Sequence, residues 1–300
     1  MTKLKQFSRN LAKRGLLLSF LLVLFFFCGC TSSTEPTYIK EKTDSAIQEI
    51  CKSEYQLDIK AKLVGDALYI YLPVEDIFVN SDKPEKITQI FKVEEPKGRF
   101  INETLELDYF IKSQSPQEQM NPYSFNKKVT EKIQEVWRVI RRVTSSLKHE
   151  GENEPKFICI ITADIKSGFE IKTINYYLDL KKIFYSLISG EEFHHRTIQD
   201  TNIDPKIIGD KDGAHVEYKD ITMEEFVIGQ IKQRIKLKFQ KPELDKSADI
   251  DKEILKIVIN TIKIYDFREF NSVELYNIIT GNKLMLNKAA VLAGTIEQKF

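Results

Sequence analysis

The stretch LDIKAKLVGDALYIYLPV, residues 57–74, says most about the fold of this chain. In its first half, apolar residues alternate strictly with charged ones, which indicates a strand with one buried face. The pair Gly65-Asp66 is typical of a tight hairpin turn. In the second half, aliphatic residues alternate with Tyr69 and Tyr71. The stretch therefore predicts a β-hairpin.

A helix before this hairpin completes a unit that recurs later in the chain. Residues 43–53 place Ile47, Ile50 and Cys51 on one helical face. The two later units are a helix over Ser124–Lys148 with strands Phe157–Ile165 and Phe169–Tyr177, and a helix over Ile250–Phe267 with strands Ser272–Thr280 and Lys283–Asn287. This order predicts an α+β fold of αββ-like units with antiparallel sheet. The units share no sequence repeat, so duplication and independent use of a common arrangement both stay open.

Further elements and three polar gaps lie between these units. We expect strands at Ile87–Val93, Leu105–Ile111 and Val216–Ile221, and helices at Leu180–Ile188 and Met223–Phe239, although Lys236–Phe239 alternates and could be strand. The proline-bearing gaps Ser81–Lys86, Ser113–Pro122 and Lys241–Asp249 predict loops. Taking Ser113–Pro122 as a boundary gives an N-terminal α+β region at 43–115 and a C-terminal one at 122–300.

The N-terminus has the three parts of an export signal. A head with five basic residues and no acidic one precedes the apolar run Leu16–Phe27, and Cys28-Gly29-Cys30 follows. The run is shorter than the roughly 20 apolar residues that span a bilayer. This segment resembles the signal of a bacterial lipoprotein, in which a small residue and Gly precede an acylated Cys. Phe27 and Cys28 depart from the usual aliphatic and small residues of that motif.

The resemblance implies a signal peptide at 1–29, followed by a lipidated Cys30 and a tether at 30–42. Acyl chains such as palmitate would then hold the protein to the bacterial cell membrane on its periplasmic side. Thr31 favours the outer membrane over the inner one if the bacterium is Gram-negative, because an acidic residue there is the inner-membrane retention signal in some bacteria. An uncleaved hydrophobic anchor and plain secretion with a free Cys30 are the alternatives.

Charge and composition narrow the classes of partner. The whole chain carries a formal charge of +1, and removal of 1–29 with its five basic residues leaves −4. A nucleic-acid-binding protein normally shows a basic footprint, so we expect no nucleic acid. The expected partners are the membrane, through the lipid anchor, and an envelope protein. With 42% hydrophobic and 30% charged residues, the remaining chain is typical of a folded body.

Apart from the lipidated Cys30, two cysteines remain after processing. Cys51 lies on the apolar face of the first helix, and Cys159 lies inside the apolar strand Phe157–Ile165. Both positions favour free thiols packed in the core, since a free cysteine behaves as a small hydrophobic residue. Their spacing does not exclude a disulfide in an oxidising compartment.

The densest cluster of potential metal ligands is GEEFHHR at 190–196. Glu191 and His194, and likewise Glu192 and His195, are three residues apart and would share a helical face that could hold a metal ion. A solvated turn after a helix end explains the same residues. This metal site is our alternative to a binding, scaffolding or assembly role. We identify no catalytic residue or cofactor, and we favour a protein that is not an enzyme.

Two surface features complete the sequence-based expectations. Basic residues gather at Arg138–Lys148 and at Lys232–Lys241, where they form either a headgroup-binding surface or solvated helix faces. The tyrosines that alternate with the aliphatic residues of 68–72 lie on the opposite face of that strand. We expect another element to cover them.

Overall fold

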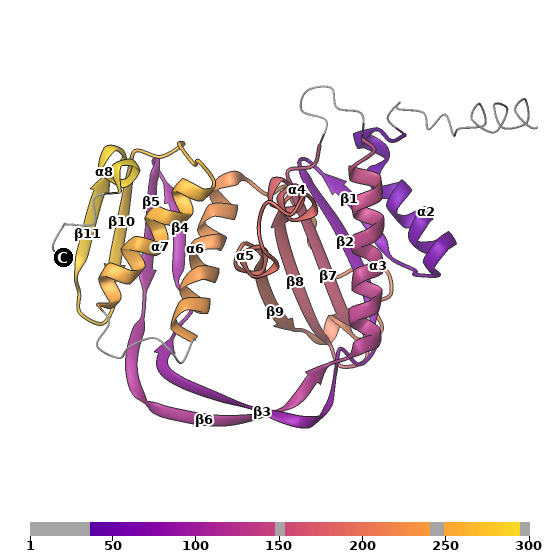
Figure 1. Ribbon diagram of the computed structural model, residues 1–300, viewed down its shortest axis with the longest axis horizontal. Coiled ribbons are helices and arrows are strands. Elements are labelled where there is room, and N and C mark those ends of the chain that lie inside the picture. Colours follow the sequence, from indigo (N-terminus) through magenta and orange to yellow (C-terminus); the bar gives the residue numbers. More distant parts are fainter. Residues whose placement is uncertain (1–36, 148–153, 241–248, 295–300) are drawn as a thin grey trace, which may run out of the picture. The chain divides into compact units, whose positions relative to one another are not determined.

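The computed structural model describes residues 37–147, 154–240 and 249–294 (Figure 1). It is an α+β structure with mostly antiparallel strands, as the sequence predicts. The residues from Tyr38 onward form one compact unit. Within the described ranges, no helix combines the length and the apolar character needed to cross a bilayer.

The predicted hairpin forms one side of a five-stranded sheet with the order β1-β2-β7-β8-β9. These strands are β1 (Lys60–Val64), β2 (Ala67–Val74), β7 (Phe157–Asp164), β8 (Phe169–Tyr176) and β9 (Ile198–Ile203). β2 pairs with β1 in an antiparallel manner but with β7 in parallel, with Tyr69 opposite Cys159. β2 and β7 are almost wholly buried, because both faces of the sheet are covered.

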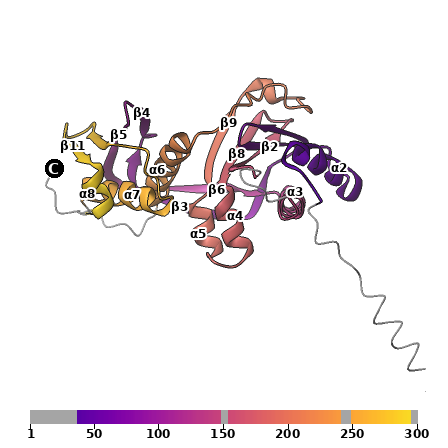
Figure 2. The same cartoon turned by 90° about the horizontal axis from the view of Figure 1, so that it is seen from above.

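Different structures cover the two faces of this sheet. On one face lie α2 (Thr43–Tyr55) and α3 (Lys127–Thr144), whose apolar sides pack on Leu68 and Ile70 (Figure 2). On the other face, Tyr69 and Tyr71 pack with residues of the irregular stretch 204–222, which contains a short 3-10 helix at Pro205–Ile207. The expectation that the tyrosines would be covered is confirmed.

Both cysteines are free and buried. Cys51 belongs to the core between the sheet and α2, and Cys159 belongs to the core on the opposite face. The sheet itself therefore separates the two thiols. Burial raises the pKa of each thiol to about 12, which leaves both unreactive.

The second sheet has four strands in the order β11-β10-β5-β4. They are β4 (Lys97–Ile101), β5 (Thr104–Tyr109), β10 (Ser272–Asn277) and β11 (Lys283–Asn287), and β5 pairs with β10 in parallel. One face carries α6 (Met223–Gln240), α7 (Ile250–Ile264) and the short α8 (Lys288–Ala293) (Figure 2). Along β5 and β11, buried residues alternate with more exposed ones, so the opposite face of this sheet is open.

A long two-stranded ribbon connects the sheets: β3 (Phe78–Val93) follows β2, and β6 (Ile111–Phe125) follows β5 (Figure 1). The loops expected at Ser81–Lys86 and Ser113–Pro122 are wrong, because both stretches lie inside these strands. The two strands satisfy each other's backbone hydrogen bonds whatever the polarity of their side chains. Their prolines fit because neither strand needs to pair on its outer edge.

The expected division into 43–115 and 122–300 does not describe the architecture. β2 from the first region pairs with β7 from the second, and β5 from the first pairs with β10 from the second. Each sheet thus contains strands of both regions. The reason is that parallel pairs join strands that are remote in sequence, which a local pattern does not reveal.

Several element boundaries also differ from the expectations. The residues expected as a strand at 216–221 form no regular structure. The helix expected over Ser124–Lys148 is α3, whose N-cap is Asn126 and which ends at Thr144. The helix expected at 180–188 is α4, which covers Tyr177–Phe184. α6 continues to Gln240, so the alternative of a strand at 236–239 is wrong. The gap at 241–249 lies outside the described residues except for Asp249, the N-cap of α7.

Candidate functional site

The predicted metal ligands lie on a short helix, α5 (Gly190–His195), which begins at the N-cap Ser189. The i, i+3 pairs therefore do have helical spacing. Glu192, however, accepts a hydrogen bond of 2.7 Å from Arg196 Nε and lies 3.7 Å from Arg234 Nη2. The described part of the chain contains no group of three or more His, Cys, Asp or Glu residues that could hold a metal ion. A metal site at Glu191, Glu192, His194 and His195 stays a prediction.

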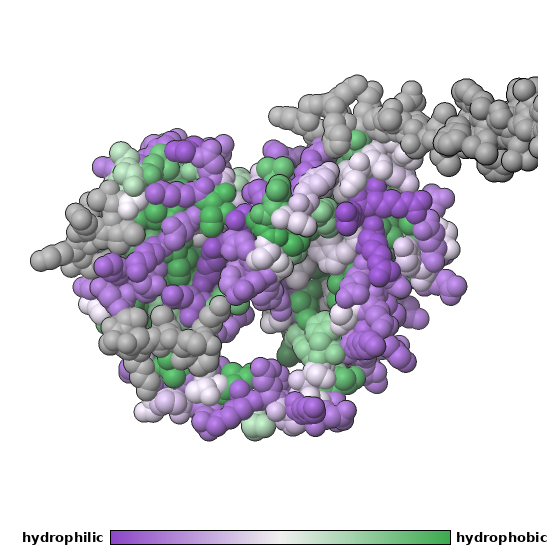
Figure 3. Space-filling model, in the orientation of Figure 1, coloured by the Kyte–Doolittle hydropathy of each residue, from purple (hydrophilic) through white to green (hydrophobic). Residues whose placement is uncertain are grey.

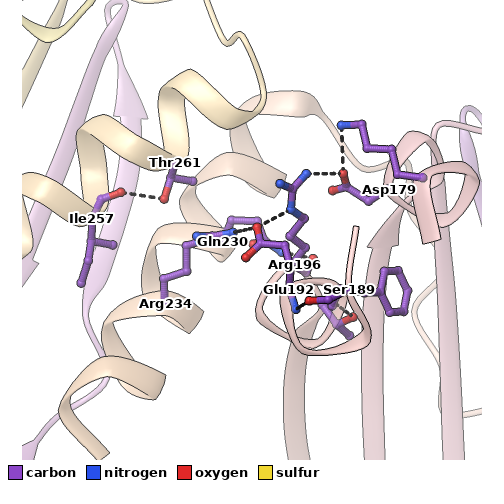
Figure 4. A network of polar contacts seen from close by, with 11 residues as sticks. Asp179, Ser189, Glu192, Arg196, Gln230, Arg234, Ile257 and Thr261 are labelled. Atoms are coloured by element: carbon purple, nitrogen blue, oxygen red, sulfur yellow. Dashed lines mark hydrogen bonds and ion pairs between the residues drawn. The ribbon is translucent and has the colours of Figure 1, made fainter. Parts of the chain in front are cut away.

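Glu192 belongs instead to a partly buried network of charges that joins α4, α5 and α6 (Figure 4). Arg196 Nη1 donates to Asp179 Oδ1 over 2.8 Å, and Gln230 Nε2 donates to the carbonyl oxygen of Arg196 over 2.5 Å. The Asp179 side chain is 1% exposed. Burial alone would raise the pKa of Glu192, but the adjacent guanidinium groups of Arg196 and Arg234 lower it overall. The carboxylate stays ionised, so these helices meet through complementary charge.

A second polar cluster lies under the tyrosine face of the five-stranded sheet. The His215 ring is held from both sides, because Nδ1 lies 2.6 Å from Asp210 Oδ2 and Nε2 lies 2.9 Å from Glu170 Oε2. The Tyr71 ring meets it edge to face at 5.7 Å, and the Tyr71 hydroxyl donates to the Asp210 carbonyl oxygen. The cluster fastens the stretch that covers the tyrosines.

The charges of this cluster favour a doubly protonated imidazole. Burial lowers the pKa of His215, but hydrogen bonds and charge from Glu170 and Asp210 outweigh it and raise that pKa above the usual 6.5. For Asp210, an acid, burial acts in the opposite direction and raises the pKa. Hydrogen bonds from the His215 side chain and nearby backbone amides outweigh burial and lower the pKa of Asp210 to about 2. Sequence reasoning missed this site because Glu170 lies on β8, remote from the turn at 209–213 that holds Asp210.

A groove follows α6 between the outermost strands β9 and β4 of the two sheets. It consists of two adjoining cavities of about 350 and 570 Å³ that share Ile198, Gly229 and Lys232. Apolar residues from five elements supply its floor: Tyr69, Val93, Phe100, Ile174, Phe226 and Ile228. Charged residues of both signs surround it: Glu94, Glu95, Arg99, Lys172, Asp200, Lys232 and Lys236.

Two glycines let α6 approach both strands closely enough to close the groove. A Cβ atom on Gly229 would lie 2.7 Å from Ile198 Cδ1 on β9, which is closer than packed carbon atoms tolerate. A Cβ atom on Gly98 of β4 would overlap the Ile228 side chain of α6. These contacts fix the depth of the groove. The residue pattern of α6 does not indicate the groove, because the groove depends on strands from both sheets.

The basic run at 232–241 does not form one surface. Lys232 pairs with Glu95 beside the groove, Arg234 is directed into the charge network around Glu192, and Lys238 lies 3.3 Å from Glu253. On α3, Arg142 pairs with Glu54 of α2 over 2.6 Å. The described part of the run at 232–241 is therefore divided among separate contacts, and in the run at 138–148 Arg142 is paired with Glu54 while Arg141 lies over the Phe184 ring.

No protein-family model, curated protein or solved structure matches this chain. The geometry of its own residues is therefore the basis for a function.

Proposed function

We propose that this protein is a lipid-anchored protein of the bacterial cell envelope that binds an extended polypeptide segment in the groove along α6. The role is that of a binding or scaffolding protein. The observation that supports it best is the groove itself, in which an apolar floor adjoins charges of both signs and the edges of two sheets.

The chemistry of the groove matches a polypeptide better than a single small ion. Its floor accepts apolar side chains, and the amides of Gln199, Gln233 and Gln240 can pair with backbone amides. β9 and β4 each end a sheet, and an extended segment can add to such an edge through main-chain hydrogen bonds. Because charges of both signs surround the groove, they select a segment with a complementary charge pattern and do not simply attract every acidic or every basic segment.

The lipid anchor is tested by labelling cells with palmitate and following the protein into the membrane fraction. The proposal expects label on the wild-type protein, and loss of both label and membrane attachment in Cys30→Ala. Ser32→Ala, close to the same cysteine, is the matched control and should keep both. Label that persists in Cys30→Ala would contradict the anchor.

The groove is tested by photo-crosslinking in cells and then with purified components. A photoreactive residue at Gln199, in the groove, should give a discrete adduct with one envelope protein, whereas one at the exposed Lys211 outside it should not. The identified segment, made as a peptide, should bind purified protein. Lys232→Glu/Lys236→Glu should weaken binding by about tenfold, a typical loss for removing close charge pairs.

Lys206→Glu/Lys211→Glu reverses the same number of charges at exposed positions outside the groove and serves as the control. Equal crosslinking at both positions would contradict binding in the groove. Peptide affinity that is unchanged in Lys232→Glu/Lys236→Glu would do the same.

A further inference from the structure

Helix α4 (Tyr177–Phe184) and the turn that follows it present apolar side chains to solvent. Leu178 is 46% exposed, Tyr185 is 74% exposed and Leu187 is 72% exposed. Leu178, Lys182 and Tyr185 follow at i, i+4 and i+7, so they lie on one side of the helix. The other side, with Tyr177 and Leu180, is buried in the core. α4 is thus apolar on both sides, and in Figure 3 hydrophobic residues gather at the position that α4 occupies in Figure 1.

A second helix of the same chain shows that this exposure is unusual. α4 ends in a Schellman motif, in which Ser186 is left-handed and the Leu187 amide donates to the Lys182 carbonyl oxygen. α7 ends in the same way, with Asp266 left-handed and the Phe267 amide bonded to Ile262. Phe267 is 3% exposed, whereas Leu187 projects from an equally ordered turn.

This surface lies beside the point where the described body meets the predicted tether. The Tyr38 amide donates to the Ser146 carbonyl oxygen just after α3. The residues before it, Thr144 and Ser145, line a pocket of about 220 Å³ together with Tyr185. Cys30 precedes Tyr38 by eight residues, which span at most about 29 Å when fully extended. A lipid on Cys30 would therefore hold this surface near the bilayer.

The charge around the surface fits the headgroup layer. Lys182 lies between the exposed Leu178 and Tyr185, and the Arg141 guanidinium stacks over the Phe184 ring at 4.9 Å. Tyrosine is enriched where hydrocarbon meets headgroups, and lysine and arginine are attracted to anionic lipids there. The exposed leucines supply the apolar contact.

We propose that Leu178, Lys182, Tyr185 and Leu187 form a docking surface for the headgroup layer of the membrane that holds Cys30, with anionic phospholipid as the ligand. This inference rests on the lipid anchor of the proposed function. Docking would fix the orientation of the body relative to the bilayer, which a tether alone leaves free.

The test places a fluorescent probe on the mature lipidated protein in vesicles of phosphatidylethanolamine and phosphatidylglycerol. Leu187→Cys carries the probe, and Ile203→Cys is the matched control, since Ile203 is 75% exposed and pairs with the opposite end of β8 from α4. Maleimide should spare the buried native thiols, whose pKa is raised to about 12. We expect a lipid-borne quencher to reduce the fluorescence at position 187 at least about fivefold more strongly than at position 203. This is the ratio in membrane affinity that corresponds to one lysine or arginine near anionic headgroups.

Lys182→Glu/Tyr185→Glu should reduce quenching at position 187 to the level at 203, and Tyr185→Trp should preserve it. Tyr185 is exposed, whereas Lys182 is half-buried and pairs with Asp179 Oδ1 over 3.2 Å, so thermal unfolding verifies that each variant folds. Equal quenching at 187 and 203 would overturn the proposal. A probe at 187 that is shielded from aqueous quencher but not reached by the lipid quencher would overturn it too, because it would show a protein occupant. Palmitate label that persists in Cys30→Ala would instead contradict the anchor.

Discussion

The two faces of β2 are buried equally but by different means. Leu68 and Ile70 face two amphipathic helices, and their contacts are purely apolar. Tyr69 and Tyr71 face an irregular stretch, and their hydroxyls donate to the carbonyl oxygens of Lys219 and Asp210. All four side chains are fully buried. Burial of the aliphatic face depends on transfer of apolar surface from water, whereas the tyrosine face also needs its polar groups paired.

The comparison shows why an irregular segment can cover a sheet. A loop carries backbone groups that must be paired, and here the tyrosine hydroxyls and the Asp210 carboxylate pair several of them. Gly65 and Asp220 meet closely at one end of the stretch, and the Asp66 amide donates to Asp220 Oδ1. The Glu170–His215–Asp210 cluster secures the middle of the stretch.

The largest expected effect comes from the aliphatic face. Leu68→Ala should lower the free energy of unfolding by about 2–5 kcal/mol, because it leaves a cavity under two helices that cannot collapse fully. The loss should be independent of pH, since no titrating group takes part. Chemical denaturation measures it. A loss below about 1 kcal/mol would show that this face is packed more loosely than the comparison requires.

The next effect belongs to the tyrosine face and depends on pH. His215→Gln removes two charge-assisted hydrogen bonds and should cost about 1.5–3 kcal/mol in mildly acidic buffer. The folded-state pKa of His215 is raised, so its contribution is full below the usual pKa of 6.5 and is lost as the pH rises through the folded value. The contribution of Asp210 is lost in the opposite direction, as the pH falls through about 2.

Thermal unfolding of wild type and His215→Gln over a range of pH measures the difference. The two curves should converge on the alkaline side. A constant gap would show that the cluster acts by packing and not by charge.

The smallest expected effect comes from two glycines in the irregular stretch. Gly213→Ala should cost roughly 1–3 kcal/mol, because φ is +70° and the new Cβ would lie 2.9 Å from the Tyr218 hydroxyl and 3.0 Å from Tyr71 Cγ. Gly209→Ala is the matched control, with φ +77° and no atom within 4 Å, so it carries only the backbone cost. Equal losses would show that Gly213 is needed for its backbone conformation alone.

Much of the secondary structure could be predicted because it follows local periodicity. The αββ order held for β1 and β2, for β7 and β8, and for β10 and β11, each with its helix before it. Of the ribbon β3–β6, only the apolar end of β3 at Ile87–Val93 and the first residue of β6 fell within the expected strands, since the polar, proline-bearing remainder has no buried face to impose alternation. The groove and the His215 cluster were missed for another reason. Each combines residues that are remote along the chain, such as Glu170 with His215.

The sequence by itself determined which segments become helices and strands along the apolar units, the burial of both cysteines in the core, and the covering of the tyrosine face. These properties depend on side-chain periodicity over a few turns or strand residues. Only the tertiary structure decided that β2 pairs with β7 and β5 with β10, that Glu192 pairs with arginine, and that α4 leaves Leu187 in solvent. The physical reason is that pairing partners and surface neighbours are chosen by long-range packing, which no local pattern of residues encodes.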